Sequence, residues 1–227
     1  PSLDMGGYAD LRFILREGGS MGDLYSRTDL RRDANGAIYM DESNNVYTQK
    51  IDNPDSYIKL GSVLPKGNLA WRNNFMWKNF HVGFMISARL GGVVFSRTQA
   101  VLDKFGVSEA SADARDNGFV LINGNDRINP ENWYTTVGST AVPQYYTYSA
   151  TNVRLQEASI GYTIPRKWLA NICDIKVSLI GRNLWMIYNK APFDPEAVAS
   201  TDNFYQGIDN FMMPSLRNVG FSLNFKF

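Results

Sequence analysis

The clearest pattern in the sequence is a strict alternation of apolar and polar residues over its last ten positions, 218–227. Asparagine, glycine, serine and lysine fill one phase of this alternation. The apolar phase consists of Val219, Phe221, Leu223, Phe225 and Phe227. Because successive side chains of a strand point to opposite faces, this period of two predicts a β-strand with one continuous apolar face.

A second stretch of alternation covers residues 66–90 and divides into two runs of about ten residues, the length that a tilted membrane strand needs. Between the runs lies a predicted two-residue turn, Lys78 and Asn79, in which Asn79 is available for a positive φ. Asn73 is the one polar break in the apolar phase of the first run. The apolar phase comprises Leu69, Trp71, Phe75, Trp77, Phe80, Val82, Phe84, Ile86, Ala88 and Leu90.

Three weaker runs predict further strands at 8–17, 152–163 and 175–187. In the run 152–163 the apolar phase slips near Gln156 and Glu157. The slip predicts a β-bulge, or else the level at which the strand leaves a bilayer. From residue 8 onward, the apolar phases are expected to form one lipid-contacting surface and the polar phases a wet interior.

The connections between the predicted strands alternate between long and short. The segment before residue 66 is long, as are 92–151 and 188–215, whereas the turn at 78–79 and the stretch 165–174 are short. Residues 166–169 within the last of these read as a helical turn. Outer-membrane barrels have short periplasmic turns and long outer loops, so this asymmetry favours a barrel over a soluble β-sandwich, which would show the same alternation.

The long segments contain local signals of their own. Residues 33–36 form a turn signal between short extended pieces. Residues 95–105 and 108–116 have helical character, with Gly106 and Gly118 as stops. The long connections are therefore expected to be structured.

Composition limits the possible classes of protein. The 227 residues carry a net charge of +1, which argues against a nucleic-acid partner, and one cysteine, Cys173, which excludes an intrachain disulfide. No run of about 18 apolar residues predicts a transmembrane helix. The chain opens at Pro1 without a signal peptide, so it is expected to be a piece of a longer protein.

Several ordered motifs resemble those of the SusC/RagA family of TonB-linked outer-membrane proteins of Bacteroidetes. The resemblance covers nearly the whole chain and is strongest from residue 151 to residue 227. The motifs are VRL at 153–155, GYTIP at 161–165, GRNLW at 181–185, APFDPE at 191–196 and MPSLR at 213–217. Their order and spacing make the set more specific than any single motif.

The resemblance implies an all-β fold, in which residues 1–227 supply the C-terminal antiparallel strands of a transmembrane barrel of about 22 strands with an N-terminal plug in its lumen. The plug and the TonB box are expected to lie outside these residues, and the chain is expected to supply roughly six membrane strands. The implied protein is a multi-pass transporter of the cell outer membrane. Its implied partners are a SusD-like surface lipoprotein, TonB, the outer-membrane lipids and a large nutrient, either a glycan or a peptide.

Candidate chemistry is sparse. His81 is the only histidine, and its place in the polar phase of a strand favours a structural residue that faces the lumen. Asp194 and Glu196 form a carboxylate pair, but the neighbouring Pro192 and Pro195 favour a stiffened loop over glycoside hydrolysis. We therefore expect no catalytic residues, no cofactor and no metal ligands.

Aromatic residues of the long segments are the candidates for substrate binding, because aromatic faces bind sugar rings and peptide side chains. The alternative is that they pack the loops on each other or on the lipoprotein partner. The candidates are Trp133, Tyr134, Tyr145, Tyr146, Tyr148, Phe204 and Tyr205.

Two other sets of side chains are assigned by the strand phase. Four arginines are expected to face the lumen, where they would hold plug carboxylates or tune selectivity: Arg72, Arg89, Arg154 and Arg182. Five aromatic residues are expected to face lipid or its interface: Trp71, Trp77, Tyr162, Trp168 and Trp185.

The preferred hypothesis is therefore gated import energised through TonB, without covalent chemistry on the substrate. The alternative is a soluble or surface-exposed β-sandwich module that binds glycans or mediates adhesion. A glycan hydrolase ranks third, because no acid/base pair lies on a defined scaffold. The choice between a glycan and a peptide stays open.

Overall fold

The computed structural model describes residues 2–140, 142–169, 172–200, 202 and 205–226. Phe227, assigned above to the apolar phase of the last strand, lies outside the described residues. The chain divides into two compact units. Unit 1 comprises Pro1–Leu64, Gly92–Ser149 and Ala197–Met212, and unit 2 comprises Pro65–Gly91, Ala150–Glu196 and Met213–Phe227.

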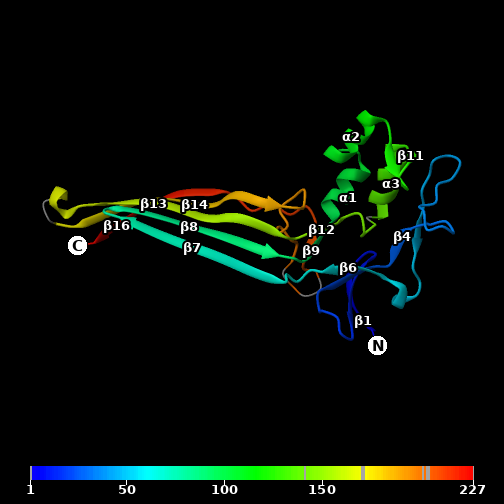
Figure 1. Ribbon diagram of the computed structural model, residues 1–227, viewed down its shortest axis with the longest axis horizontal. Helices are drawn as coiled ribbons and strands as arrows, with labels where there is room; N and C mark the ends of the chain where they lie inside the picture. The colour runs from blue at the N-terminus through cyan, green and yellow to red at the C-terminus, as the bar shows by residue number, and fades with distance from the viewer. Residues whose placement is uncertain (1, 141, 170–171, 201, 203–204, 227) are drawn as a thin grey trace. The chain divides into compact units, whose positions relative to one another are not determined.

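Unit 2 is a five-stranded antiparallel sheet with the strand order β16-β14-β13-β8-β7 (Figure 1). The strands are β7 (Gly67–Trp77), β8 (Phe80–Leu90), β13 (Asn152–Ile164), β14 (Asp174–Asn189) and β16 (Asn218–Lys226). The shortest has 9 residues and the longest 16, which matches the length that a tilted membrane strand needs. Five of the predicted strands are thereby confirmed.

The register sorts the side chains of this sheet onto two chemically distinct faces. One cross-strand row runs from Phe75 through Val82, Ile160 and Leu179 to Phe221. These side chains are between 41% (Val82) and 77% (Phe221) exposed, so no second sheet formed by the described residues packs on them. The predicted apolar face is confirmed, and it is bare, which a soluble β-sandwich does not allow.

The slip predicted at residues 156–157 is a β-bulge. The register shifts directly after Leu155 against both neighbouring strands. Leu155 lies opposite Ile86, and Ala158 lies opposite Phe84. The bulge therefore keeps the apolar phase of β13 on one face above and below the slip.

Aromatic side chains cross the apolar face in two rows. Trp77 lies opposite Phe80, and Phe80 lies opposite Tyr162. The ring centroids of Phe80 and Tyr162 are 4.8 Å apart. Trp71 shares a second row with Trp185 across two intervening strands. Trp71 and Trp77 are six residues apart in the sequence, about 20 Å at a rise of ~3.3 Å per residue. Two such rows are the arrangement expected of the aromatic girdles of a membrane barrel.

The short connections lie at one end of the sheet. Trp77 pairs with Phe80, so the first connection is the two-residue turn at Lys78 and Asn79. The positive φ of this turn, 53°, belongs to Lys78 and not to Asn79, which corrects the expectation for Asn79. The second connection contains the predicted helical turn as a short 3-10 helix, η2 (Arg166–Leu169). At the opposite end of the sheet the chain passes into the segments of unit 1.

The strand predicted at residues 8–17 is present as β2 (Leu11–Arg16), but its assignment to the lipid-contacting surface was wrong. This run becomes β2 in a separate antiparallel sheet of unit 1, so the sheet of unit 2 has five strands and not six. Leu11 and Phe13 are 0% and 1% exposed and cannot contact lipid. Ile14, in the opposite phase, is buried as well, because this six-residue strand is covered on both faces. The order of this sheet is β1 (Ser2–Tyr8), β2 (Leu11–Arg16), β3 (Asp23–Ser26) and β6 (Ile58–Ser62).

The rest of unit 1 combines three small strand groups with three helices. The strands pair as β4 (Thr28–Leu30) with β5 (Thr48–Lys50), β10 (Val120–Ile122) with β11 (Asp126–Ile128), and β9 (Val93–Ser96) with both β12 (Thr147–Ser149) and β15 (Ile208–Asp209). The helices are α1 (Arg97–Lys104), α2 (Glu109–Asn117) and α3 (Pro130–Thr140), and a 3-10 turn, η1, covers Pro54–Ser56. None of the helices in the described ranges is long and apolar enough to cross a membrane.

The helix signals were only partly read from the sequence. The predicted start at residue 95 is too early, because Ser96 caps α1 by accepting a hydrogen bond from the Gln99 N–H. Gly118 ends α2 with a φ of 80°, as predicted. Helix α3 was not predicted, although its start carries a cap: the Asn129 side chain accepts a hydrogen bond from the Glu131 N–H at 2.8 Å.

We expect Phe13→Ala to destabilise unit 1 by about 3–5 kcal/mol, because it empties a fully buried core position. Hydrogen exchange of the β2 amides in the full-length protein measures this loss. The matched control is Leu15→Ala in the same strand, which is half-buried and should cost clearly less. Equally small effects of both variants would contradict the core position of Phe13.

Candidate functional site

The polar face of the sheet carries a row of paired charges. Arg72 of β7 and Arg182 of β14 both contact Glu157 of β13, at 3.1 and 3.5 Å. The register places Arg72, Met85, Glu157 and Arg182 in one row across four strands. Both arginines are exposed, so each ion pair contributes at most about 1 kcal/mol. The row leaves one excess positive charge on this face.

All four predicted arginines lie on this polar face. Arg89 lies opposite Asn152, and Arg154 lies opposite Ser87 in the next polar row. His81 belongs to the same face, where its Nε2 lies 2.9 Å from the Thr163 Oγ1. That the face lines a lumen stays a prediction. Three of the arginines form ion pairs with carboxylates of this chain, so these three do not need carboxylates of a plug as partners.

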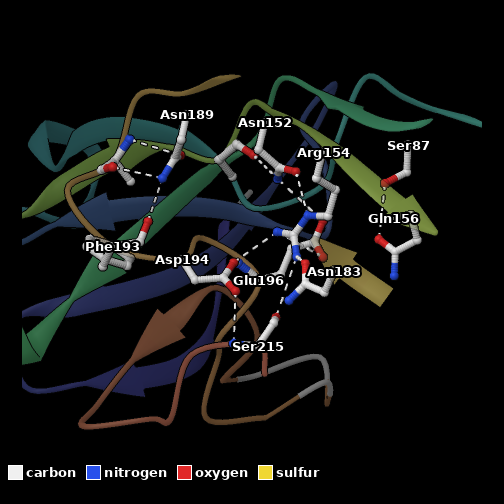
Figure 2. A network of polar contacts seen from close by, with 12 residues as sticks. Ser87, Asn152, Arg154, Gln156, Asn183, Asn189, Phe193, Asp194, Glu196 and Ser215 are labelled. Atoms are coloured by element: carbon white, nitrogen blue, oxygen red, sulfur yellow. Dashed lines mark hydrogen bonds and ion pairs between the residues drawn. The ribbon is translucent and has the colours of Figure 1, made fainter. Parts of the chain in front are cut away.

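Arg154 is the centre of a buried polar network (Figure 2). Its side chain is only 2% exposed, although Arg154 belongs to strand β13 of the open sheet. The guanidinium Nη2 lies 2.9 Å from Asp194 Oδ1 and 3.3 Å from Glu196 Oε2. A buried charge of this kind is tolerated only when it is paired and hydrogen-bonded.

Further hydrogen bonds complete what we term the Arg154 latch, consisting of Arg154, Asn152, Asp194, Glu196 and Ser215. Arg154 Nε donates to Asn152 Oδ1 at 3.3 Å. The backbone N–H groups of Ser215 and Glu196 each donate to Asp194 at 3.1 Å. The latch thus ties the loop after β14 and the segment before β16 to strand β13.

The latch, together with the neighbouring Asn183, joins four sequence motifs that lie far apart along the chain. Arg154 belongs to the VRL motif, and Asn183 of the GRNLW motif accepts a hydrogen bond from Arg154 Nη1 at 3.4 Å. Asp194 and Glu196 belong to APFDPE, and Ser215 belongs to MPSLR. Four of the five motifs that carry the family resemblance therefore meet in one network of polar contacts.

The latch also explains the carboxylate pair. Both carboxylates contact one buried guanidinium and stiffen the loop, in line with the expected structural role. Burial raises the pKa of Asp194, but hydrogen bonds from Ser215 and from the Glu196 N–H, together with Arg154, outweigh burial and hold the pKa below its ordinary value. Among the described residues, no three His, Cys, Asp or Glu side chains gather as metal ligands.

The candidate aromatics of unit 1 divide into two groups. Trp133 and Tyr146 are buried in the core, and the rings of Trp133 and Tyr145 meet edge-to-face at 5.4 Å. These three aromatic residues pack within unit 1, as the alternative to substrate binding expects. Tyr134 and Tyr148 are half-buried and Tyr205 is exposed. Substrate contact stays a prediction for them. Phe204 lies outside the described residues.

Sequence reasoning missed three members of the polar network. Asn152, Asn183 and Ser215 were not singled out, although two of them lie within the recognised motifs and Asn152 directly precedes one. Contacts such as the one between Arg154 and Ser215, 61 residues apart, leave no periodic trace in the sequence. The motif set was the available signal.

One curated relative and several solved structures are similar to this chain. No family model matches the chain. TonB-dependent receptor P3 of Formosa agariphila is 27% identical over 207 residues, a match that covers 86% of this chain and 19% of that protein. The chain therefore spans about a fifth of the length of the curated relative it matches.

Solved structures share the fold. The RagAB peptide importer in its closed-closed state matches with a TM-score of 0.61 and 15% identity over 96% of this chain and 26% of that chain. The open-open state matches with a TM-score of 0.61 and 12% identity over 100% of this chain and 28% of that chain. Together these matches confirm the predicted resemblance to TonB-dependent outer-membrane proteins of the SusC/RagA kind and the barrel-strand fold class.

We expect Arg154→Ala to weaken the latch by about 3–5 kcal/mol, because it leaves the Asp194 carboxylate buried without its cation. Hydrogen exchange of residues 191–196 and 213–217 in the full-length protein reports the opening. The control is Arg182→Ala, which removes an exposed ion pair and should cost under about 1 kcal/mol. A loss of equal size in the control would refute the latch.

The latch should also weaken in acid. Because the native pKa of Asp194 lies below its ordinary value of 3.8, its contribution is complete above that value and disappears as the pH falls through the native pKa. Exchange of the Ser215 amide, corrected for its intrinsic rate, should show this loss of protection. Asp194→Asn should be less protected near pH 6 and lack this acid step. An unchanged acid step in Asp194→Asn would assign the titration to another group.

Proposed function

We propose that this chain is the C-terminal part of an active transporter of the outer membrane that imports a large nutrient, a glycan oligosaccharide or a peptide. A SusD-like surface lipoprotein delivers the nutrient, and TonB energises the import through an N-terminal region outside these residues. The chain contributes five strands to the barrel wall and most of three outer loops.

The bare apolar face of the sheet is the observation that carries this proposal. Its exposed row includes Phe75, Leu179 and Phe221 and needs a hydrocarbon neighbour, which the outer membrane supplies. The opposite face holds arginines and Glu157, which suits a water-filled or plugged lumen. Homology to a TonB-dependent receptor and the fold of a peptide importer support transport across the outer membrane.

The Arg154 latch gives the proposal a mechanical part. Import requires outer loops that keep their position at the mouth of the barrel while other parts move. The latch anchors the 191–196 loop and the 213–217 segment to the wall through a buried charge network. These segments form a fixed part of the mouth, and substrate-dependent movement is assigned to other loops.

The test uses the full-length receptor in its own cells. We expect it to fractionate with the outer membrane, and uptake of a nutrient above the porin size limit should disappear when either the receptor or TonB is deleted. Phe221→Arg places a charge on the lipid face, which costs about 2–4 kcal/mol near the bilayer centre and should lower the amount of assembled receptor several-fold.

The matched control is Ser222→Arg, one residue further along β16 and on the polar face. It should assemble at the wild-type level. Equal loss in both variants, or recovery of the wild-type protein from the soluble fraction, would contradict a membrane barrel. Uptake that persists without TonB would contradict the energised mechanism alone.

A further inference from the structure

Unit 1 contains a cavity of about 260 Å³ that lies between its three helices. The end of α1 supplies Asp103 and Lys104, and Phe105 follows directly. Helix α2 supplies Arg115, and helix α3 supplies Glu131 and Tyr134. Of the predicted binding aromatics that the structure describes, Tyr134 lines the cavity.

The walls of the cavity are fixed by contacts of their own. The Tyr134 hydroxyl donates to the Ala110 carbonyl at 3.1 Å, which ties α3 to α2. Arg115 Nη1 donates to the Gly106 carbonyl at 2.6 Å, which ties α2 to the end of α1. The cavity is therefore formed before any ligand arrives, which lowers the entropic cost of binding.

The charges around the cavity balance. Its lining holds two acidic residues, Asp103 and Glu131, and two basic residues, Lys104 and Arg115. Three of them already have partners: Asp103 accepts a hydrogen bond from Gln99 at 2.9 Å, Arg115 binds the Gly106 carbonyl, and the Lys104 Nζ lies 5.5 Å from the centre of the Phe105 ring. A ligand with a net charge would meet a like charge as well as an opposite one.

The cavity therefore offers a ligand hydrogen-bond donors and acceptors beside an aromatic ring. Carboxylates accept, guanidinium and ammonium groups donate, and hydroxyl groups of a ligand can do either. Phe105 lines the cavity and is 69% exposed, so the part of its ring that Lys104 leaves open offers an apolar surface to the C–H groups of a ligand. The volume lies just below the range of about 300–1,000 Å³ that is typical of drug-sized ligands, so it suits one ring.

From this chemistry we propose that the cavity between α1, α2 and α3 binds one pyranose ring of a neutral glycan. This inference rests on the proposed transport function and favours the glycan over the peptide. Phe105 contacts the apolar face of the ring, and Glu131 and Arg115 bind its hydroxyl groups.

The test measures binding of methyl pyranosides to the purified full-length receptor in detergent. Saturation-transfer NMR with the methyl glycosides of glucose, galactose, mannose and xylose should detect binding of at least one of them. Phe105→Ala should weaken that binding about tenfold, because it removes the aromatic face. Glu131→Gln, which keeps the shape of an exposed side chain, should weaken it as well.

The matched control is Val107→Ala. Val107 is 67% exposed, close to the value for Phe105, but it does not line the cavity, so binding should be unchanged. The inference is overturned if no glycoside binds, if Phe105→Ala binds as the wild type does, or if free amino acids compete for the site. Uptake that depends on TonB while no glycoside binds would refute this inference alone. Glycoside binding by a receptor that fails the uptake test would refute the proposed function alone.

Discussion

A sheet of five strands that carries large apolar side chains on one face sets the main constraint on this molecule. Exposing apolar surface to water costs roughly 25 cal/mol per Å², and this face runs the length of every strand. Contact with bilayer hydrocarbon removes that cost. A sheet can lie in hydrocarbon, however, only if its backbone hydrogen bonds are satisfied. The strand ladders supply these bonds inside the sheet, apart from the bulge in β13 and the part of β14 beyond Arg182, and further strands of a closed barrel would pair the outer edges of β7 and β16.

The second requirement is to hold long connections in place at one end of such a sheet. The Arg154 latch does this with one buried cation, two carboxylates and the backbone N–H of Ser215 from the segment before β16. A buried pair is weak evidence for stability as such, since apolar packing often does as well. Its value is geometric, because the guanidinium contacts both carboxylates in only one arrangement of the two segments. Breaking the pair leaves a buried charge without a partner.

The parts of the fold that could be read from the sequence are those with a local period. The bulge after Leu155 was visible because the apolar phase changes there, and the register confirms it. The run 8–17 misled, since Ile14 interrupts its polar phase and marks a strand covered on both faces. Helix α3 was overlooked although Asn129 caps it. The latch and the cavity of unit 1 arise from contacts between distant segments, which a single sequence does not encode locally.

The central claim is that successive residues of one strand face lipid and water in turn. Single cysteines placed at residues 219–225 of β16, in a full-length receptor with Cys173→Ser, can carry spin labels in liposomes. Collision rates with oxygen, which partitions into lipid, and with a water-soluble nickel complex report the environment of each label. The account predicts oxygen maxima at Phe221 and Leu223 and nickel maxima at Ser222 and Asn224. Nickel access at every position, without a period of two, would contradict it.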